Sequence, residues 1–158
     1  MVDLAPKPVR ASRIQLAQMM MPEHANNHGN VHGGWIMKLA DEAGALASTR
    51  HAGHRTVTVA IDQMVFHQPI HIGDLIILDA EVTYAGHTSM EVEVHVTAEN
   101  PITGERIRAN TAHFVYVALD EDRKPTPVPP LIAETPDEQQ HLEAGRERQQ
   151  RRLSQKSR

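Results

Sequence analysis

The chain has 158 residues, of which 40% are hydrophobic and 3% aromatic, and its formal net charge is −4 at pH 7. This length favours a single domain, and the charge gives no sign of a nucleic-acid partner. The chain has no cysteine, which excludes disulfides, zinc ribbons and thiol catalysis. It also lacks the apolar run of a signal peptide and any stretch of about 18 apolar residues, so we expect a cytoplasmic protein without a membrane span.

The first predicted elements are a strand and, after a loop, a long helix. Residues 12–21 alternate weakly between apolar and polar, which indicates a strand that Pro22 ends. Turn formers fill residues 26–34, where asparagine and glycine tolerate left-handed backbone. Residues 35–50 contain no proline and mostly good helix formers, so we predict a helix there that Gly53 closes.

The predicted helix is apolar or small nearly all round. At about 100° per residue, Lys38, Glu42 and Thr49 fall within a polar strip of about 40°. A helix with so little polar surface is typical of a buried helix. Asp41 lies roughly 80° from the centre of that strip. A carboxylate in apolar surroundings is costly unless it has a partner or a task, so Asp41 either caps or pairs locally or takes part in chemistry.

Four further strands follow the helix, and short turns join most of them. They are predicted at residues 56–67, 75–84, 90–98 and 105–119. A change of phase near Asp62 and Gln63 predicts a β-bulge in the first of them. The short turns at residues 85–87 and 100–104 imply antiparallel pairing. The chain is therefore predicted to be an α+β protein in which one sheet packs around one helix.

After residue 120 the composition changes. Four prolines between residues 125 and 130 predict a stiff, extended linker. Thr135, Pro136 and Glu138 form a good helix start. The helix that follows is polar all round, which favours a frayed, solvated tail over an arm that docks on another subunit. We therefore divide the chain into a domain at residues 1–120 and a linker with a polar helix or tail at 121–158.

Several blocks of the sequence resemble the signature of the hotdog-fold acyl-CoA thioesterases, in the branch of the brain-type acyl-CoA hydrolase and the short bacterial enzymes. The resemblance covers about residues 14–119. Its blocks lie at residues 22–26, 29–35, 41–43, 50–51, 56–60, 66–70 and 73–74. It implies an antiparallel five-stranded sheet wrapped around one long buried helix. It also implies hydrolysis of acyl-CoA to a free fatty acid and coenzyme A.

The resemblance assigns two catalytic residues. Asp41 is implied as the general base, or as a nucleophile that forms an anhydride. Asn26 is implied to orient the water or the thioester through its amide. In the family, the asparagine and the aspartate of one site come from two facing modules. This chain has one module, so we expect a dimer at minimum, with a trimer of dimers left open, in which Asn26 of one subunit meets Asp41 of the other.

The remaining site residues are predicted from position and resemblance together. Backbone N–H groups at the glycine pair before the helix can polarise a thioester carbonyl. Cations and turn residues at the entrance can hold the phosphates of coenzyme A, with Arg106 and Arg108 as weaker candidates. The predicted substrate-binding residues are Gly33, Gly34, His54, Arg55, Thr58, Thr88 and Ser89. No cofactor is expected, because coenzyme A is part of the substrate and the product.

Three rival functions stay open at the level of sequence. The first is metal-assisted hydrolysis, because His24, His28 and His32 are spaced by four like metal ligands on a helix. The asparagines and the glycine between them disfavour a helix. We therefore expect no metal site. A non-catalytic acyl-CoA sensor would not need both Asn26 and Asp41. A hotdog dehydratase would need a histidine beside an acid. The acyl-chain length depends on packing that the sequence does not reveal.

Overall fold

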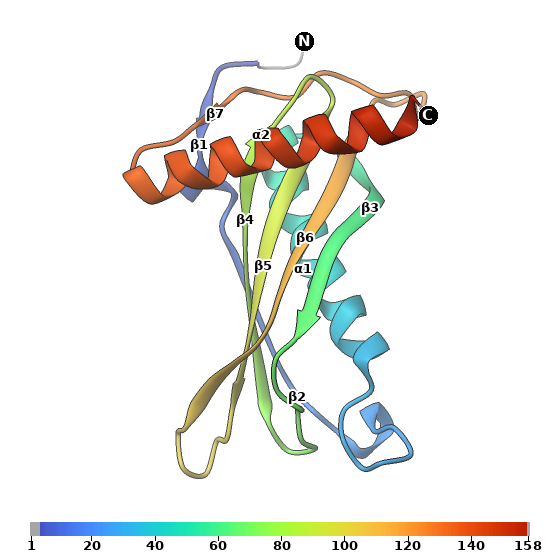
Figure 1. The fold of residues 1–158 in the computed structure, drawn as a ribbon, viewed down its shortest axis with the longest axis vertical. Helices are drawn as coiled ribbons and strands as arrows, with labels where there is room; N and C mark the ends of the chain where they lie inside the picture. The colour runs from blue at the N-terminus through green and yellow to red at the C-terminus, as the bar shows by residue number, and fades with distance from the viewer. Residues whose placement is uncertain (1–3, 158) are drawn as a thin grey trace.

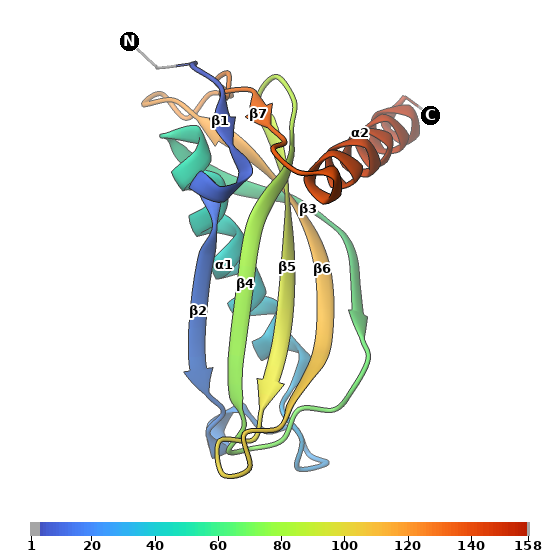
Figure 2. The ribbon, with the colours of Figure 1, turned by 90° about the vertical axis from the view of Figure 1, so that its left-hand side faces the viewer.

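The computed structural model describes residues 4–157, in which an antiparallel sheet lies between two helices (Figures 1 and 2). The sheet has the strand order β2-β4-β5-β6-β3. In chain order the elements are β1 (Lys7–Pro8), η1 (Val9–Ser12), β2 (Ile14–Met19), η2 (Pro22–His24), α1 (Gly33–Ala52), β3 (Arg55–Phe66), β4 (Leu75–Ala85), β5 (Ser89–Glu99), β6 (Arg106–Leu119), β7 (Leu131–Ile132) and α2 (Pro136–Lys156). None of the helices within residues 4–157 is long and apolar enough to cross a bilayer.

Helix α1 begins and ends at local signals in the sequence. His32 caps its start, because the N–H of Gly34 donates to the His32 ring Nδ1 at 3.0 Å. Gly53 ends it with a φ of +69°, a left-handed conformation that suits glycine. The predicted helix is confirmed, and the structure extends it to Gly33–Ala52.

The core lies between α1 and the sheet. Alternate β5 residues, including Val92, Val94 and Val96, are fully buried on the face that packs against the helix. The helix meets them mainly with small side chains such as Ala40 and Ala43. Small residues let the helix lie close to the sheet, which explains how a chain with so few aromatics builds a close-packed core.

The side of α1 that faces away from the sheet is exposed. It carries the predicted polar residues Lys38 and Glu42, but also two apolar side chains, Met37 (38% exposed) and Leu46 (46% exposed). The exposed strip is therefore wider than the polar residues alone predict.

Strand β3 forms one edge of the sheet and pairs only with β6 among the described strands. Its register against β6 shifts between Thr58 and Ala60 and again between Ile61 and Gln63. The second shift confirms the bulge predicted from the sequence, and the first is an additional one. Such irregularities bend a strand and increase its twist.

The C-terminal segment packs onto the sheet. Strand β7 pairs in parallel with β1, and α2 then crosses the face of the sheet opposite α1 (Figure 2). The predicted helix start is confirmed, since Glu138 N–H donates to Thr135 Oγ1 at 3.1 Å. Gly145 is buried, and Arg148 donates two hydrogen bonds to the buried Glu91 of β5.

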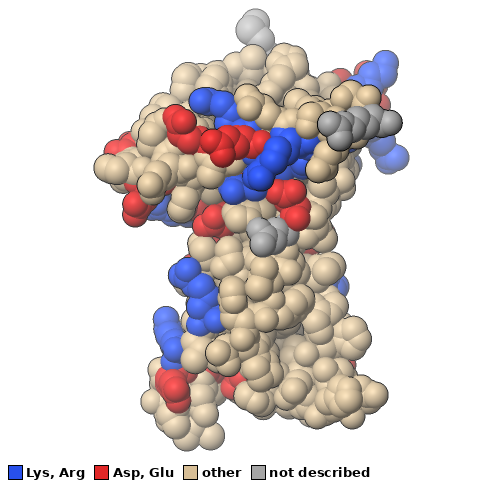
Figure 3. Space-filling model, in the orientation of Figure 1, with Lys and Arg blue, Asp and Glu red and all other residues tan. Residues whose placement is uncertain are grey.

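The prediction of a frayed, solvated tail is therefore wrong, and the helix docks on its own sheet. Figure 3 shows charged side chains of both signs gathered along this helix. The division of the chain into domains at residue 120 stays a prediction.

Candidate active site

Asp41 lies in the middle of α1, where the helix faces β3 and β6. Its carboxylate oxygen Oδ1 accepts a hydrogen bond from Thr58 Oγ1 at 2.7 Å and another from the Tyr116 hydroxyl at 3.0 Å. The side chain of Asp41 is half-buried. The other carboxylate oxygen, Oδ2, has no hydrogen-bond partner within residues 4–157. The predicted acid thus has two donors on one oxygen and an open acceptor on the other.

Tyr116 is a site residue that sequence reasoning missed. Its side chain is fully buried, and its hydroxyl lies 3.0 Å from the main-chain oxygen of Asp41 as well as from Oδ1. Burial, followed by the nearby charge of Asp41, raises the pKa of Tyr116, so the phenol stays protonated and acts as a donor. A tyrosine within an apolar strand was the available signal, because a buried phenol needs a polar partner.

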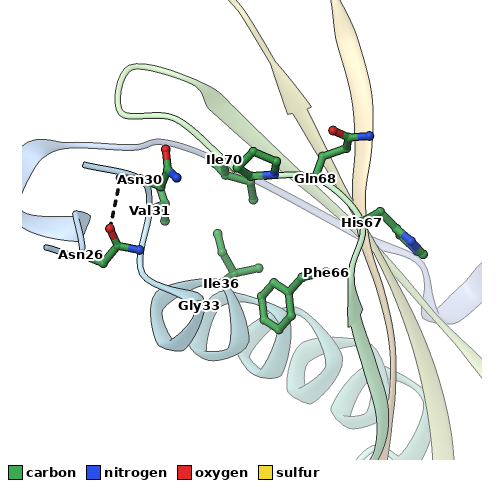
Figure 4. Close-up of a pocket in the computed structure, with 10 residues that line it drawn as sticks. Asn26, Asn30, Val31, Gly33, Ile36, Phe66, His67, Gln68 and Ile70 are labelled. Carbon is green, nitrogen blue, oxygen red and sulfur yellow. Dashed lines mark hydrogen bonds between the residues drawn. The ribbon is translucent and has the colours of Figure 1, made fainter. Parts of the chain in front are cut away.

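Asn26 lies in the loop before α1, and its side chain helps to fold that loop. Its Oδ1 accepts hydrogen bonds from the N–H groups of His28 at 2.9 Å and Asn30 at 3.2 Å. Its own N–H donates to the Asn30 carbonyl at 2.7 Å. The amide Nδ2 has no partner among the described residues, and Figure 4 shows it on the side of the amide away from Asn30. The side chain can therefore act as a donor.

A cavity of about 270 Å³ lies beside Asn26 and the start of α1 (Figure 4). It is lined by Asn26, Asn30, Val31, Gly33, Ile36, Phe66, His67, Gln68, Pro69 and Ile70. Gly33 leaves room for the ring of Phe66, since a Cβ at this position would lie 3.3 Å from the ring. The cavity thus combines apolar walls with the amide of Asn26 and the first turn of a helix.

The two glycines at the start of α1 differ in what their N–H groups do. The N–H of Gly34 is taken by the His32 cap. The N–H of Gly33 has no partner within residues 4–157, which leaves it as the donor at the helix terminus. Donors at this position favour an anion or a polarised carbonyl oxygen.

The structure does not bring Asn26 and Asp41 to one cavity within the chain. Neither Asp41 nor its partner Thr58 lines the cavity beside Asn26. Asp41 lies eight positions after Gly33 along α1, which corresponds to about 12 Å along the helix axis. Within a single chain, Asn26 and Asp41 therefore lie at separate places, the first in the loop before α1 and the second within the helix.

The residues predicted to hold coenzyme A fall into two places. His54 and Arg55 lie at the end of α1 and line a second cavity of about 570 Å³. Its remaining lining residues are Thr56, Val57, Leu119, Asp120, Glu121 and Arg123. Thr88 and Ser89 lie in the turn between β4 and β5 and do not line this cavity.

The turn residues and Arg106, one of the two weaker cation candidates, are already engaged in contacts. The Thr88 carbonyl accepts from the Ala118 N–H at 3.0 Å, and the Ser89 hydroxyl accepts from Gln149 Nε2 at 3.3 Å. Arg106 forms an exposed ion pair with Glu99.

The three histidines spaced by four do not lie on one helix. His24 ends a 3₁₀ turn, where its ring Nδ1 accepts from the Met21 N–H at 2.9 Å, and His32 caps α1. His28 follows in a turn. Across the described part of the chain, no group of three His, Cys, Asp or Glu side chains is arranged to hold a metal ion.

A long helix packed on a five-stranded antiparallel sheet, with its start beside a polar loop, defines the hotdog fold. The family model of the thioesterase superfamily matches residues 28–105. A Zymomonas mobilis protein named an uncharacterized acyl-CoA thioester hydrolase is 41% identical over 128 residues, covering 81% of this chain and 83% of its own length. This chain therefore belongs to the thioesterase superfamily, among the hotdog acyl-CoA thioester hydrolases.

Longer relatives are also similar to this chain. The cytosolic acyl coenzyme A thioester hydrolase of Rattus norvegicus is 38% identical over 145 residues. The match covers 90% of this chain but only 38% of the rat protein. This chain thus spans well under half the length of that relative.

Two solved structures are similar over nearly the whole chain. A hexameric acyl-CoA thioesterase has a TM-score of 0.91 at 34% identity, covering 96% of this chain and 97% of that one. An acyl-CoA hydrolase of Staphylococcus aureus, in complex with butyryl coenzyme A and coenzyme A, has a TM-score of 0.87 at 31% identity, covering 95% and 92%. Variants of the latter, each with alanine in place of an aspartate, an asparagine or a threonine, have also been solved.

Proposed function

We propose that this chain hydrolyses acyl-CoA thioesters to a free fatty acid and coenzyme A, with Asp41 as the catalytic carboxylate. The observation that carries the proposal is the geometry of Asp41, whose Oδ1 is held by Thr58 and Tyr116 while Oδ2 is open. The relatives that carry thioester hydrolase names support the reaction class. The aspartate, asparagine and threonine replaced in the Staphylococcus aureus enzyme match the residue types of Asp41, Asn26 and Thr58.

In the proposed reaction, Asp41 acts as a general base through Oδ2. It takes a proton from a water molecule as the water oxygen adds to the thioester carbonyl carbon. The carbon–sulfur bond then breaks, and the thiolate of coenzyme A takes the proton back from Asp41. In the alternative route, Oδ2 attacks the carbonyl carbon itself, and the carbon–sulfur bond breaks to release the thiolate of coenzyme A and leave an anhydride. Water then hydrolyses the anhydride, which restores the Asp41 carboxylate and supplies the proton that the thiolate takes up.

The carbonyl oxygen needs donors where negative charge develops. The Nδ2 group of Asn26 and the N–H of Gly33 lie at one cavity and are the candidates. A donor aimed at a developing oxyanion contributes about a hundredfold or more to the rate. The Oδ1 atom of Asn26 already accepts hydrogen bonds from two N–H groups of its own loop. Donation to the thioester carbonyl through Nδ2 therefore fits Asn26 better than acceptance of a hydrogen bond from water.

A second copy of the chain is proposed to complete each site. Strand β3 has an unpaired edge and exposed apolar side chains, an arrangement that soluble proteins avoid unless it is covered. These side chains are Val57, Val59, Ile61, Val65 and Phe66. Asp41 lies beside this edge, where a partner would bring its Asn26 loop. The similar hexameric thioesterase supports assembly beyond a dimer, such as a trimer of dimers.

The phosphates of coenzyme A are proposed to bind at the end of α1. Arg55 and Arg123 contribute cations to that cavity and His54 contributes a ring N–H, and Thr88 and Ser89 lie in the neighbouring turn. Cations and hydroxyl donors bind phosphate oxygens well. Acidic residues also line the cavity. We expect Arg55→Ala to raise KM, because a cation that binds the phosphates is lost, and to leave kcat nearly unchanged, because Arg55 lies away from Asp41.

The proposed reaction needs no cofactor, and we propose a cytoplasmic location. One relative is named a cytosolic enzyme, which supports the location. Activity should survive exhaustive treatment with a chelator. If activity is lost on chelation and returns when zinc is added, the hydrolysis is metal-assisted and the carboxylate mechanism is wrong.

The decisive experiment is release of free thiol from a panel of acyl-CoAs of graded chain length. We expect turnover by the wild type and a fall in kcat of about a hundredfold or more for Asp41→Asn. The matched control is Glu42→Gln, which changes the adjacent carboxylate and should do far less. Binding of acyl-CoA without turnover across the panel would identify the chain as a sensor. A greater loss for Glu42→Gln would show that Asp41 is not the catalytic acid.

A further inference from the structure

The ring of Tyr116 reaches from β6 under α1 to the catalytic carboxylate. Its single hydroxyl proton is shared between the main-chain oxygen and Oδ1 of Asp41, both at 3.0 Å. One donor therefore fixes the side chain of Asp41 relative to its own backbone. Thr58 approaches the same Oδ1 from β3, so the carboxylate is tied to two strands at once.

Gly44 makes the approach of Tyr116 possible. A Cβ at position 44 would collide with the Tyr116 hydroxyl and would lie 2.9 Å from the ring carbon that bears it. Glycine costs roughly 1 kcal/mol relative to alanine within a helix, so its presence here has a local structural reason. Because Gly44, about one turn after Asp41, has no side chain, the phenol of Tyr116 can pack directly against the helix backbone.

We propose that Tyr116, seated on Gly44, is a positioning residue for Asp41: it holds Oδ1 so that Oδ2 faces the water that attacks the thioester. This inference rests on the proposed hydrolase function. A donor to Oδ1 leaves Oδ2 as the oxygen that is free to accept the proton of the water. Because the phenol itself stays protonated, the hydroxyl keeps its donor role over the pH range in which the enzyme works.

The kinetic test is Tyr116→Phe, which keeps the ring and removes the hydroxyl. A hydrogen bond to a charged group contributes enough to lower kcat about tenfold to a hundredfold when it is lost. KM should change less than about twofold, since Tyr116 does not touch the substrate. The acid limb of the profile of kcat against pH should also move, because the lost hydroxyl contacts the carboxylate directly, whereas a packing role would leave the limb in place.

The matched control is Tyr84→Phe. Tyr84 is the only other tyrosine of the chain and lies on β4 against Gly145 of α2. Its hydroxyl is not bonded to Asp41, so this variant should keep the kcat and the pH profile of the wild type.

A second measurement does not depend on the folding of the Tyr116→Phe protein or on turnover. Wild-type protein grown with 3-fluorotyrosine has two fluorine sites, which Tyr84→Phe assigns by ¹⁹F NMR. The Tyr116 resonance should shift with pH, with a midpoint at the acid limb of the kinetic profile. The Asp41→Asn protein should lose this titration, whereas the Glu42→Gln protein should keep it.

The outcomes separate the inference from the proposed function. If Tyr116→Phe keeps the kcat and the acid limb of the wild type while Asp41→Asn is inactive, the positioning role is overturned and the hydrolase function stands. The inference is also overturned if Tyr116→Phe lowers kcat without moving the acid limb and the Tyr116 resonance titrates in the Asp41→Asn protein as it does in the wild type. Tyr116 would then be a packing residue only. If the wild type hydrolyses no acyl-CoA but the Tyr116 resonance still titrates with Asp41, the proposed function fails instead.

Discussion

At the scale of single residues, the adjacent acids Asp41 and Glu42 show how helix geometry separates two carboxylates. Glu42 points to the exposed side and pairs with Lys38 one turn earlier at 3.0 Å. Asp41 is turned by about 100° toward the sheet, where two hydroxyls hold it. An exposed pair of this kind contributes at most a few tenths of a kcal/mol, about 0.3–0.5. Of the two acids, only Asp41 accepts hydrogen bonds from hydroxyl groups of the sheet.

The first prediction concerns Thr58, the other donor to Asp41. Thr58→Val removes the hydroxyl and keeps the shape of the side chain. We expect kcat to fall about tenfold, because Oδ1 loses a charge-assisted hydrogen bond. Thiol release measures the effect, and Thr97→Val on β5 serves as the control. Full activity in Thr58→Val would show that this hydroxyl plays no part in holding the base.

At the scale of elements, α2 shows that a polar helix can dock when the surface beneath it is also polar. Glu91 has no exposed surface and accepts hydrogen bonds from Arg148 Nε at 2.8 Å and Nη2 at 2.7 Å. Thr83 donates a third at 2.8 Å. Gly145 lets the helix approach Tyr84 closely, since a Cβ there would lie 2.7 Å from the Tyr84 Cβ. The helix is held by a buried charge pair and a close backbone approach.

The second prediction tests this charge pair. Arg148→Ala leaves the buried carboxylate of Glu91 without its main partner. Breaking one side of a buried pair costs about 3–5 kcal/mol, so we expect the free energy of unfolding to fall by roughly that amount. Urea denaturation measures it. Arg151→Ala, at an exposed position of the same helix, should change stability by less than about 0.5 kcal/mol. Equal small effects would mean that α2 does not depend on Arg148.

Two carboxylates on the outer face of the sheet share an electrostatic pattern. Burial acts to raise the pKa of Glu91, but the hydrogen bonds and charge of Arg148 lower it below the ordinary value. Burial likewise opposes ionisation of Glu93, but hydrogen bonds from His113 and His95 hold its pKa well below that value. Both groups therefore bind protons less readily in the folded chain than in the unfolded one.

The third prediction follows from the sign of these shifts. A carboxylate with a depressed folded pKa stabilises the fold above its unfolded pKa and loses that contribution as the pH falls through the folded pKa. The free energy of unfolding should thus decline steadily as the pH falls below the ordinary glutamate pKa of 4.5. Denaturation curves at a series of pH values measure this. Glu93→Gln should flatten the decline, whereas Glu121→Gln at an exposed position should not.

At the scale of the whole molecule, the chain has surfaces that a second copy would cover. β3 is an unpaired edge with exposed apolar side chains, and α1 exposes Met37 and Leu46 on its outer side. Within one chain, Asn26 lines a cavity that Asp41 does not reach. Pairing two copies so that each Asn26 loop reaches the other's Asp41 would account for both observations.

The fourth prediction is that inactive variants complement each other. A dimer of one Asn26→Ala chain and one Asp41→Ala chain has one site with both lesions and one with neither. Random mixing of equal amounts makes about half of the dimers of this kind, so activity should recover to about a quarter of the wild-type value. Thiol release measures recovery after co-expression, with affinity tags to verify mixed dimers. Verified mixed dimers without activity would place both residues in one chain's site, or show that one of them is not catalytic.

The elements of the hotdog domain were predictable because their signals are local. Alternation in β5, the glycine that ends α1 and the phase change in β3 each depend on neighbours along the chain. The resemblance directed attention to Asp41 and Asn26, and helix geometry alone separated Asp41 from Glu42. The docking of α2 was mispredicted because periodicity detects an apolar stripe, whereas this helix packs through Gly145 and Arg148.

The sequence by itself determined the order of the main strands and the helix α1, and their approximate positions, because capping, turn chemistry and periodicity act over a few residues. The tertiary structure alone decided that Tyr116 and Thr58 meet on one oxygen of Asp41, and that Glu91 lies under α2. These contacts join residues as far as 75 positions apart in the chain. They depend on strand order and register, which are set by how the whole core packs rather than by any local pattern.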